Sequence, residues 1–195
     1  AINPVSNKIE IYEKVKWEIA SPNAKQKVYK DDVLCSTVRV NLRKIAIIDK
    51  DLEDGIATVG FCVIRANKEI VFPKFLYYEC LSETFNKNLL LHSSGTTYPI
   101  VKNKDVLGIE ISIPPLEEQL EIIDLFQTID DLIEVTEDQE KNLTNLKNQL
   151  LRELFSDKKQ FGNYLNDDEF ETIKFNQIAF NISDRVQPQE TECEI

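Results

Sequence analysis

The sequence is poor in the residues from which metal sites and nucleophilic sites are usually built. It has a single histidine, His92, and no two cysteines form a CxxC pair. A zinc site needs about four closely spaced nitrogen or sulfur ligands, so we expect no metal and no cofactor. The four cysteines are widely spaced: Cys35, Cys62, Cys80 and Cys193. Scattered thiols of this kind are typical of a reducing compartment, and we therefore expect a cytoplasmic protein.

Long apolar runs and nucleotide-binding loops are also missing. No segment is apolar for long enough to span a bilayer, and no basic-then-apolar stretch resembles a signal peptide. The hydroxyl-rich residues 92–99 lack the lysine and the spacing of a P-loop, which argues against nucleotide hydrolysis. No methyltransferase cofactor motif is present, and a cysteine nucleophile would need His92 beside a thiol. The sequence therefore gives little support to an enzymatic function.

The negative charge is confined to one part of the chain. The net charge is −11, but residues 1–110 hold 16 basic against 14 acidic residues, and residues 111–195 hold 7 against 20. The first part is therefore mildly basic. This distribution is compatible with a DNA-binding domain followed by an acidic spacer.

A long helix is predicted from Leu116 to Phe155. Pro114 and Pro115 end the preceding segment, and no further proline or glycine occurs before Gly162. A broad apolar stripe as far as Leu132 is typical of a helix that packs on a domain. From there a narrower seam, with steps of three and four residues, has the rhythm of a coiled coil. It consists of Ile129, Leu132, Thr136, Gln139, Leu143, Leu146 and Leu150.

Such a helix would be about 60 Å long and could not bury its seam alone. We expect a partner helix, from elsewhere in a longer protein or from another chain. The alternative is two shorter helices that break near Thr136 and fold into a bundle.

The residues before this helix predict an α+β domain with a curved, mostly antiparallel sheet and short helices. Strands are expected at 33–40, 45–48, 60–65 and 108–113, with a further short one at 15–19. Pro73 and the apolar spacing after it predict a helix over 73–81, which residues 85–91 extend or follow. The loop 92–99, with its hydroxyl groups around Gly95, is suited to binding phosphate.

Four stretches together resemble the specificity (S) subunit of type I restriction–modification enzymes. They are 32–44 (DVLCSTVRVNLRK), 73–78 (PKFLYY), 93–99 (SSGTTYP) and 111–119 (ISIPPLEEQ), and they cover residues 30–155 in the order of the family. The resemblance implies a DNA target recognition domain in residues 1–112, which reads one half of a bipartite double-stranded site. It also implies a spacer or dimerisation helix at 113–157, which pairs antiparallel with a second such helix, in cis or in a homodimer.

The family has no catalytic residues of its own. The resemblance of the chain to this family implies that methyltransferase (modification) subunits are its partners and that the restriction subunit is engaged only indirectly. Residues 158–195 are then a linker and a segment similar to the opening of a recognition domain. The chain resembles either a piece of a two-repeat subunit or a permuted half-subunit, and we expect the last segment to complete the domain of 1–112.

Candidate DNA contacts fall into two groups. Arg39, Asn41, Arg43 and Lys44 flank a strand pair and are expected to point outward, where arginine reads guanine and asparagine reads adenine. Six further residues are expected to position phosphates: Ser93, Ser94, Thr96, Thr97, Lys102 and Lys104. Each could instead be an ordinary solvated side chain. The competing interpretation of the whole chain is a coiled-coil assembly protein whose α+β domain does not bind DNA.

Overall fold

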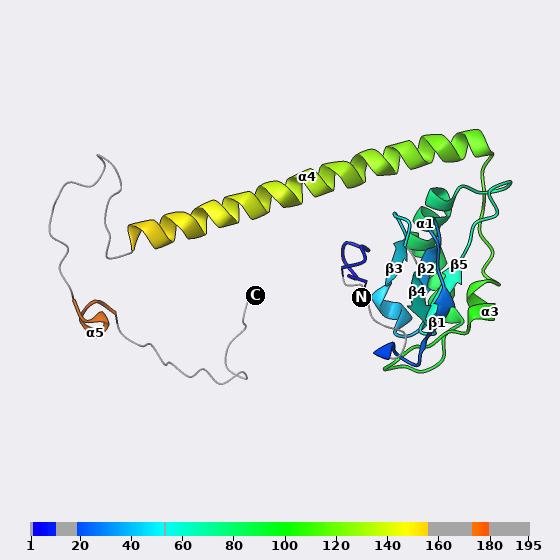
Figure 1. The fold of residues 1–195 in the computed structure, drawn as a ribbon, viewed down its shortest axis with the longest axis horizontal. Helices are drawn as coiled ribbons and strands as arrows, with labels where there is room; N and C mark the ends of the chain where they lie inside the picture. The colour runs from blue at the N-terminus through cyan, green and yellow to red at the C-terminus, as the bar shows by residue number, and fades with distance from the viewer. Residues whose placement is uncertain (1, 11–18, 53, 156–172, 180–195) are drawn as a thin grey trace, which may run out of the picture. The chain divides into compact units, whose positions relative to one another are not determined.

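The computed structural model describes residues 2–10, 19–52, 54–155 and 173–179. It divides into two compact units, residues 1–137 and residues 138–195. The first unit holds two small antiparallel sheets, three helices and the first part of a long helix, which continues into the second unit (Figure 1). The expected α+β class, with antiparallel strands, short helices and a long helix, is confirmed.

The central strand of the first unit is β2 (Val33–Ser36), which pairs with β3 (Ile45–Ile47) and with β5 (Phe61–Ile64). The second sheet pairs β1 (Ala24–Lys27) with β4 (Ile56–Thr58). All four residues of β2 are buried, as expected of a strand that is covered on both faces.

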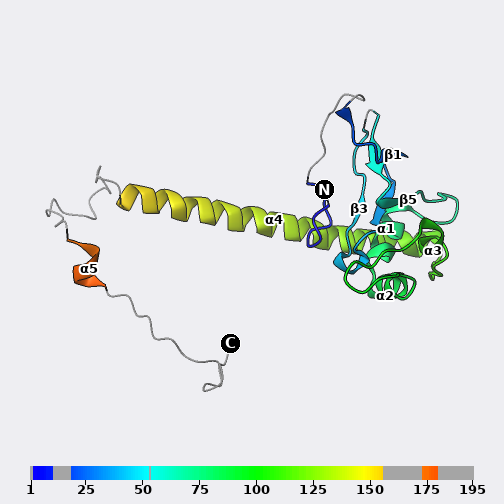
Figure 2. The same ribbon diagram turned by 90° about the horizontal axis from the view of Figure 1, so that it is seen from below.

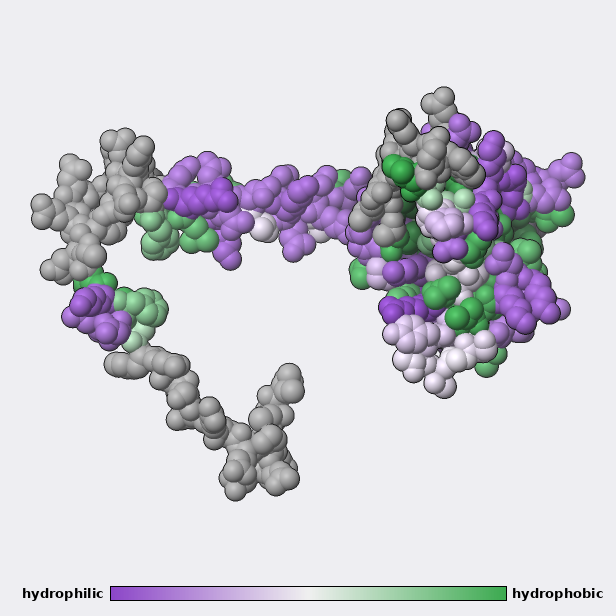
Figure 3. All heavy atoms as spheres, turned by 60° about the horizontal axis from the view of Figure 1, so that its bottom comes forward, coloured by the Kyte–Doolittle hydropathy of each residue, from purple (hydrophilic) through white to green (hydrophobic). Residues whose placement is uncertain are grey.

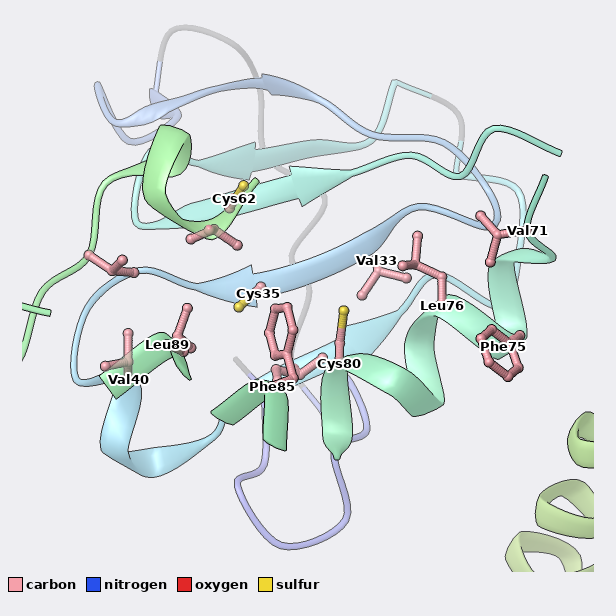
Figure 4. Packing of buried hydrophobic residues seen from close by; sticks show 13 residues of the cluster. Val33, Cys35, Val40, Cys62, Val71, Phe75, Leu76, Cys80, Phe85 and Leu89 are labelled. Carbon is pink, nitrogen blue, oxygen red and sulfur yellow. The ribbon is translucent and has the colours of Figure 1, made fainter. Parts of the chain in front are cut away.

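Alternate residues of β2 belong to two different hydrophobic clusters. Val33 and Cys35 face the helices, whereas Leu34 packs with Ala46 and Ile48 on the other face. This follows from the two-residue period of side chains along a strand. Figure 4 shows Val33 and Cys35 directed toward the side chains of two short helices, α1 (Pro73–Leu81) and α2 (Glu83–Leu91).

Sequence signals define α1 and α2 closely. Pro73 occupies the first turn of α1, where its missing N–H costs nothing, and the observed helix matches the prediction. Ser82 separates the two helices, and its hydroxyl accepts the Phe85 N–H at 3.1 Å as the N-cap of α2. The buried Asn86 donates to the carbonyl oxygens of Cys80 and Ser82, which ties the two helices together.

The long helix α4 (Leu116–Leu154) is continuous through Thr136. The expected helix is therefore confirmed, and the alternative of a break near Thr136 is wrong. The Thr136 hydroxyl donates to the Leu132 carbonyl oxygen at 2.8 Å, so this polar residue is accommodated without interrupting the helix. The last element, α5 (Phe175–Ile178), is a single turn.

The first turns of α4 pack on the domain through α1. Ile122 and Ile123 contact the hydrophobic cluster that contains Val33 and Cys35, which we call the main cluster, and the rings of Tyr78 and Phe126 lie 4.9 Å apart. The Tyr78 hydroxyl also donates to Asp130 at 2.8 Å. Figure 2 shows α1 beside the start of α4. Leu125 is 60% exposed, so the packing does not use the whole apolar stripe that the sequence suggested.

Several strand predictions need correction. The strand expected over 33–40 ends at Ser36, because the chain then enters a one-turn 3-10 helix, η2 (Val40–Leu42). No strand forms over 108–113: these residues follow a short helix, α3 (Asn103–Val106), and have no strand beside them in the described part of the chain. Ile109 and Ile111 instead pack singly against the main cluster. β1 and β4 were not predicted.

Two predictions lie outside what the structure describes. Residues 15–18 of the expected strand 15–19 are not among the described residues, and neither is most of 158–195. The completion of the domain by its last segment therefore stays a prediction.

Candidate nucleic-acid interface

Two segments that were identified separately in the sequence as candidate DNA contacts lie side by side on the surface of the first unit. Val38 and Ile100 form an antiparallel bridge. The Val101 N–H donates to the Thr37 carbonyl oxygen at 3.0 Å, and the Val40 N–H donates to that of Pro99 at 3.3 Å. We call residues 37–44 the arginine loop and residues 93–101 the hydroxyl loop. Most of the predicted contact residues are therefore on two adjoining loops.

The arginine loop is built around η2, with an arginine at each end. Arg39 has φ 54° and ψ 52°, and Arg43 has φ 48° and ψ 41°, so both adopt the left-handed conformation. This conformation costs an arginine about 1 kcal/mol. Val40, which is 2% exposed, anchors the turn in the core, and the Arg43 N–H donates to its carbonyl oxygen at 3.0 Å. The core thus holds two strained, exposed arginines in place.

The side chain of Arg39 stacks on a ring from the other loop. Its guanidinium carbon lies 4.5 Å from the centroid of Tyr98, which is itself 54% exposed. Tyr98 was not among the predicted site residues. It lies within the motif 93–99, but its partnership with Arg39 depends on a contact between residues that are far apart in the sequence.

The hydroxyl loop is closed by a pair of hydrogen bonds between Ser94 and Ile100, at 2.8 and 2.9 Å. Gly95 has φ 89°, and a Cβ there would lie 3.0 Å from the Tyr98 carbonyl oxygen, so glycine is required for this tight turn. The Ser93 hydroxyl donates to the Leu90 carbonyl oxygen at 2.7 Å, so it completes the end of α2. Thr96 and Thr97 are exposed, which leaves them better placed than Ser93 to contact a ligand.

The predicted lysines differ in their placement. Lys102 and Lys104 are exposed, at the N-terminal cap and within the single turn of α3, and Lys102 follows directly after the hydroxyl loop. Lys44 is half-buried at the end of the arginine loop, while Asn41 is exposed in η2.

The cations of this surface have no acidic partners among the described residues. The ion pairs found among the described residues involve cations outside this surface: Lys8, Lys27, Arg65, Lys68 and Lys87. A surface whose positive groups are not neutralised by carboxylates can attract a polyanion. We call the exposed side chains of the two loops, with Lys102 and Lys104, the basic surface.

The three cysteines that the structure describes are unsuited to nucleophilic chemistry. Burial raises the pKa of the Cys35 thiol to about 12, and it also raises the pKa of Cys80 and of Cys62. These thiols are therefore protonated at neutral pH. His92 is not beside them, because it is exposed and its Nδ1–H donates to the Asn88 carbonyl oxygen at 2.8 Å. Within the described ranges, no group of His, Cys, Asp and Glu side chains could hold a metal ion.

The predicted pairing face of α4 is largely exposed. Ile129, Leu132, Leu143 and Leu146 are between 45% and 67% exposed, and Leu150 is half-buried. Figure 3 shows hydrophobic side chains gathered on one side of α4 toward its C-terminal end. No helix in the described residues is both long enough and apolar enough to cross a membrane.

A family model, described as the type I restriction modification DNA specificity domain, matches residues 5–145. The chain is 28% identical over 136 residues to the type I restriction enzyme HindI specificity subunit of Haemophilus influenzae, covering 69% of this chain and 30% of that protein. It is 30% identical over 118 residues to the MjaVIII specificity subunit of Methanocaldococcus jannaschii, covering 59% and 27%. The chain thus spans less than a third of these curated relatives.

Solved structures show the same similarity. The HsdS subunit from Thermoanaerobacter tengcongensis superposes with a TM-score of 0.60 at 31% identity, over 82% of this chain and 42% of that one. A structure that addresses complex assembly and conformational transition of the type I R-M system gives a TM-score of 0.61 at 32% identity, with the same coverage.

Proposed function

Because the chain belongs to the type I restriction–modification DNA specificity family, we propose that it binds double-stranded DNA and reads one half of a bipartite target. In this proposal the chain is not an enzyme. Methylation resides in modification subunits that dock on it, and cleavage resides in a restriction subunit that it engages only through them.

The observation that carries the proposal is the joining of the arginine loop and the hydroxyl loop into one surface. Val38 pairs with Ile100 there, and the guanidinium carbon of Arg39 lies 4.5 Å from the ring centroid of Tyr98 in the hydroxyl loop. Base-reading groups and phosphate-positioning groups must lie together in a DNA-binding site, since the second set fixes the register of the first.

Each predicted contact has a role in this proposal. Arg39 and Arg43 reach base edges, where an arginine fork pairs with guanine, and Asn41 pairs with adenine. The hydroxyl groups of Thr96 and Thr97 bind phosphate oxygens, and so does that of Ser94, which also donates to the Ile100 carbonyl oxygen at 3.4 Å. Lys102 and Lys104 supply charge to the phosphate backbone, whereas the half-buried Lys44 and the internally bonded Ser93 contribute less.

We further propose that α4 is the spacer that joins this half-site reader to a second one. Its exposed seam needs a partner helix, because burial of leucine and isoleucine side chains drives coiled-coil association. The relatives are more than three times as long as the part matched here, so they have room for a second reader and a second spacer helix. The partner can equally be a second copy of this chain.

The test is DNA affinity as a function of salt concentration, measured by fluorescence anisotropy with a pool of randomised duplexes. We expect Lys102→Ala with Lys104→Ala to weaken binding to all sequences. We also expect the negative slope of log K against log salt to become smaller in magnitude by about 0.9 per lost phosphate contact. The matched control is Lys68→Ala with Lys87→Ala, which removes two lysines that are already paired with Asp31 and Glu83.

Equal salt slopes for the two double variants would contradict the proposed surface. If no DNA binding is detected while the chain still self-associates through α4, the assembly-protein interpretation replaces the proposal.

A further inference from the structure

Two arginine–tyrosine stacks among the described residues of the first unit differ in whether the arginine is already hydrogen-bonded. Arg65 lies 4.7 Å from the ring of Tyr29, but two of its nitrogens donate to Asp32, each at 2.7 Å. Asp32 is 1% exposed, so this arginine is committed to a buried carboxylate. Arg39 lies 4.5 Å from the ring of Tyr98, and its guanidinium has no hydrogen bond or ion pair with any described residue.

The guanidinium of Arg39 lies over the ring of Tyr98, and its N–H donors have no acceptor among the described residues. An aromatic ring contacts the face of a guanidinium, whereas the N–H donors lie in its plane and point outward. A stacked arginine can therefore form two parallel hydrogen bonds to an acceptor pair without leaving the ring.

Both partners of the stack are held by the main chain. Arg39 is fixed in a left-handed conformation at the start of η2, and Tyr98 is carried by the turn that Gly95 makes possible. The bridge between Val38 and Ile100 fixes one loop against the other. The position of the guanidinium is thus set by two anchored segments, although the side chain itself is exposed.

We propose that Tyr98 is a positioning residue that holds Arg39 in the orientation in which it reads one base pair, most simply a guanine through its O6 and N7 acceptors. This inference rests on the proposed DNA-binding function and adds a residue to it. Fixing the arginine before binding reduces the conformational entropy lost when the hydrogen bonds form. Tyr98 therefore acts on sequence preference at one position, and its contribution to binding of DNA in general is small.

The experiment is selection of preferred duplexes from a randomised DNA library, using the full chain assembled with the modification subunits of its system. The first requirement is that the protein without substitutions selects a preferred DNA sequence. If it selects none, the proposed function itself is refuted. Arg39→Ala is then expected to relax the preference at one base pair. We expect Tyr98→Ala to relax the same base pair and to reduce the affinity ratio between preferred and altered duplexes about tenfold.

Three further variants separate positioning from a structural role. Tyr98→Phe keeps the ring and is expected to keep the base preference. Tyr98→Leu keeps apolar volume without an aromatic face and is expected to behave like Tyr98→Ala. Tyr29→Ala removes the ring beside an arginine that is already bound to Asp32, so it should leave the base preference unchanged.

Two results would overturn the inference while the proposed function stands. The first is a Tyr98→Leu protein that retains full preference at the base pair relaxed by Arg39→Ala. The second is a Tyr98→Leu protein that loses affinity equally for every duplex, since a loss of that kind reflects general damage to the surface. Thermal denaturation of each variant checks that folding is retained, which we expect because the Tyr98 side chain is exposed.

Discussion

The carboxamide oxygen of Gln119 accepts the main-chain N–H of Phe72 at 3.0 Å, which joins the first turns of α4 to the residue that precedes α1. The carboxamide nitrogen donates to the carbonyl oxygens of Ile70 and Pro114. Gln119 is fully buried, and its amide supplies hydrogen-bond partners to three main-chain groups. The glutamine that ends the motif 111–119 is therefore a buried polar link between the domain and its long helix.

Replacing Gln119 with alanine should destabilise the first unit by about 3 kcal/mol, because three hydrogen bonds are lost and main-chain groups are left without partners. Urea unfolding followed by intrinsic fluorescence measures the change. Gln127→Ala is the matched control on the same helix, since its amide donates only to the exposed Asp131. A loss in Gln119→Ala no larger than that of the control would show that the link is dispensable.

Alkaline pH should lower the free energy of unfolding through the buried thiols. Burial raises the pKa of Cys35 to about 12, against about 8.5 for a cysteine in the unfolded chain. The unfolded state therefore releases this proton first, and stability falls as pH rises from about 8.5 toward 12. The slope approaches at most about 1.4 kcal/mol per pH unit for each such thiol.

The measurement is urea unfolding between pH 8.5 and 10. Burial also raises the pKa of Tyr77 to about 12, which adds a loss of the same sign above the ordinary tyrosine pKa near 10. Cys35→Ala with Cys80→Ala should be less stable at every pH but should show a shallower slope. An unchanged slope in this double variant would assign the alkaline loss to other groups.

The exposed seam of α4 predicts how association responds to substitution. Leu143→Asp with Leu146→Asp places two charges in the seam and should abolish pairing with the partner helix, whereas Thr136→Leu fills a polar position and should strengthen it severalfold. Glu137→Leu adds the same side chain outside the seam and is the control. Sedimentation equilibrium measures each effect, and equal strengthening by Thr136→Leu and Glu137→Leu would reject the seam as drawn.

Light scattering of the unmodified chain identifies the source of that partner helix. A dimer mass means that the seams of two copies pair, which builds a reader of a symmetric site. A monomer mass means that the partner helix belongs to a longer protein, and the pairing variants must then be studied in it.

The helices α1, α2 and α4 could be predicted from local signals, whereas two of the five strands, β1 and β4, could not. Pro73 and Ser82 define α1, and the prolines before Leu116 define the start of α4. β1 has the sequence AKQK, which contains no β-branched residue, and it is a strand only because it pairs with β4. The alternating isoleucines of 108–113 led to the opposite error, since Ile109 and Ile111 are half-buried against the hydrophobic core, and no strand lies beside them in the described part of the chain.

The candidate site shows the same division. Arginine, asparagine and lysine in 39–44 and the hydroxyl groups of 93–97 could be singled out by residue type. That the two segments adjoin, and that Tyr98 stacks on Arg39, follows from main-chain hydrogen bonds between residues about sixty positions apart. The internal role of Ser93 and the partial burial of Lys44 likewise depend on tertiary packing.

The alternation of residues along η2 bears on how new sequence preferences could be engineered. Val40 is buried and Leu42 half-buried, whereas Arg39, Asn41 and Arg43 are exposed. The outward positions can therefore be randomised without altering the hydrophobic core. Positions 39 and 43 have positive φ, so a useful library there is rich in Arg, Asn, Asp and Gly and omits β-branched residues.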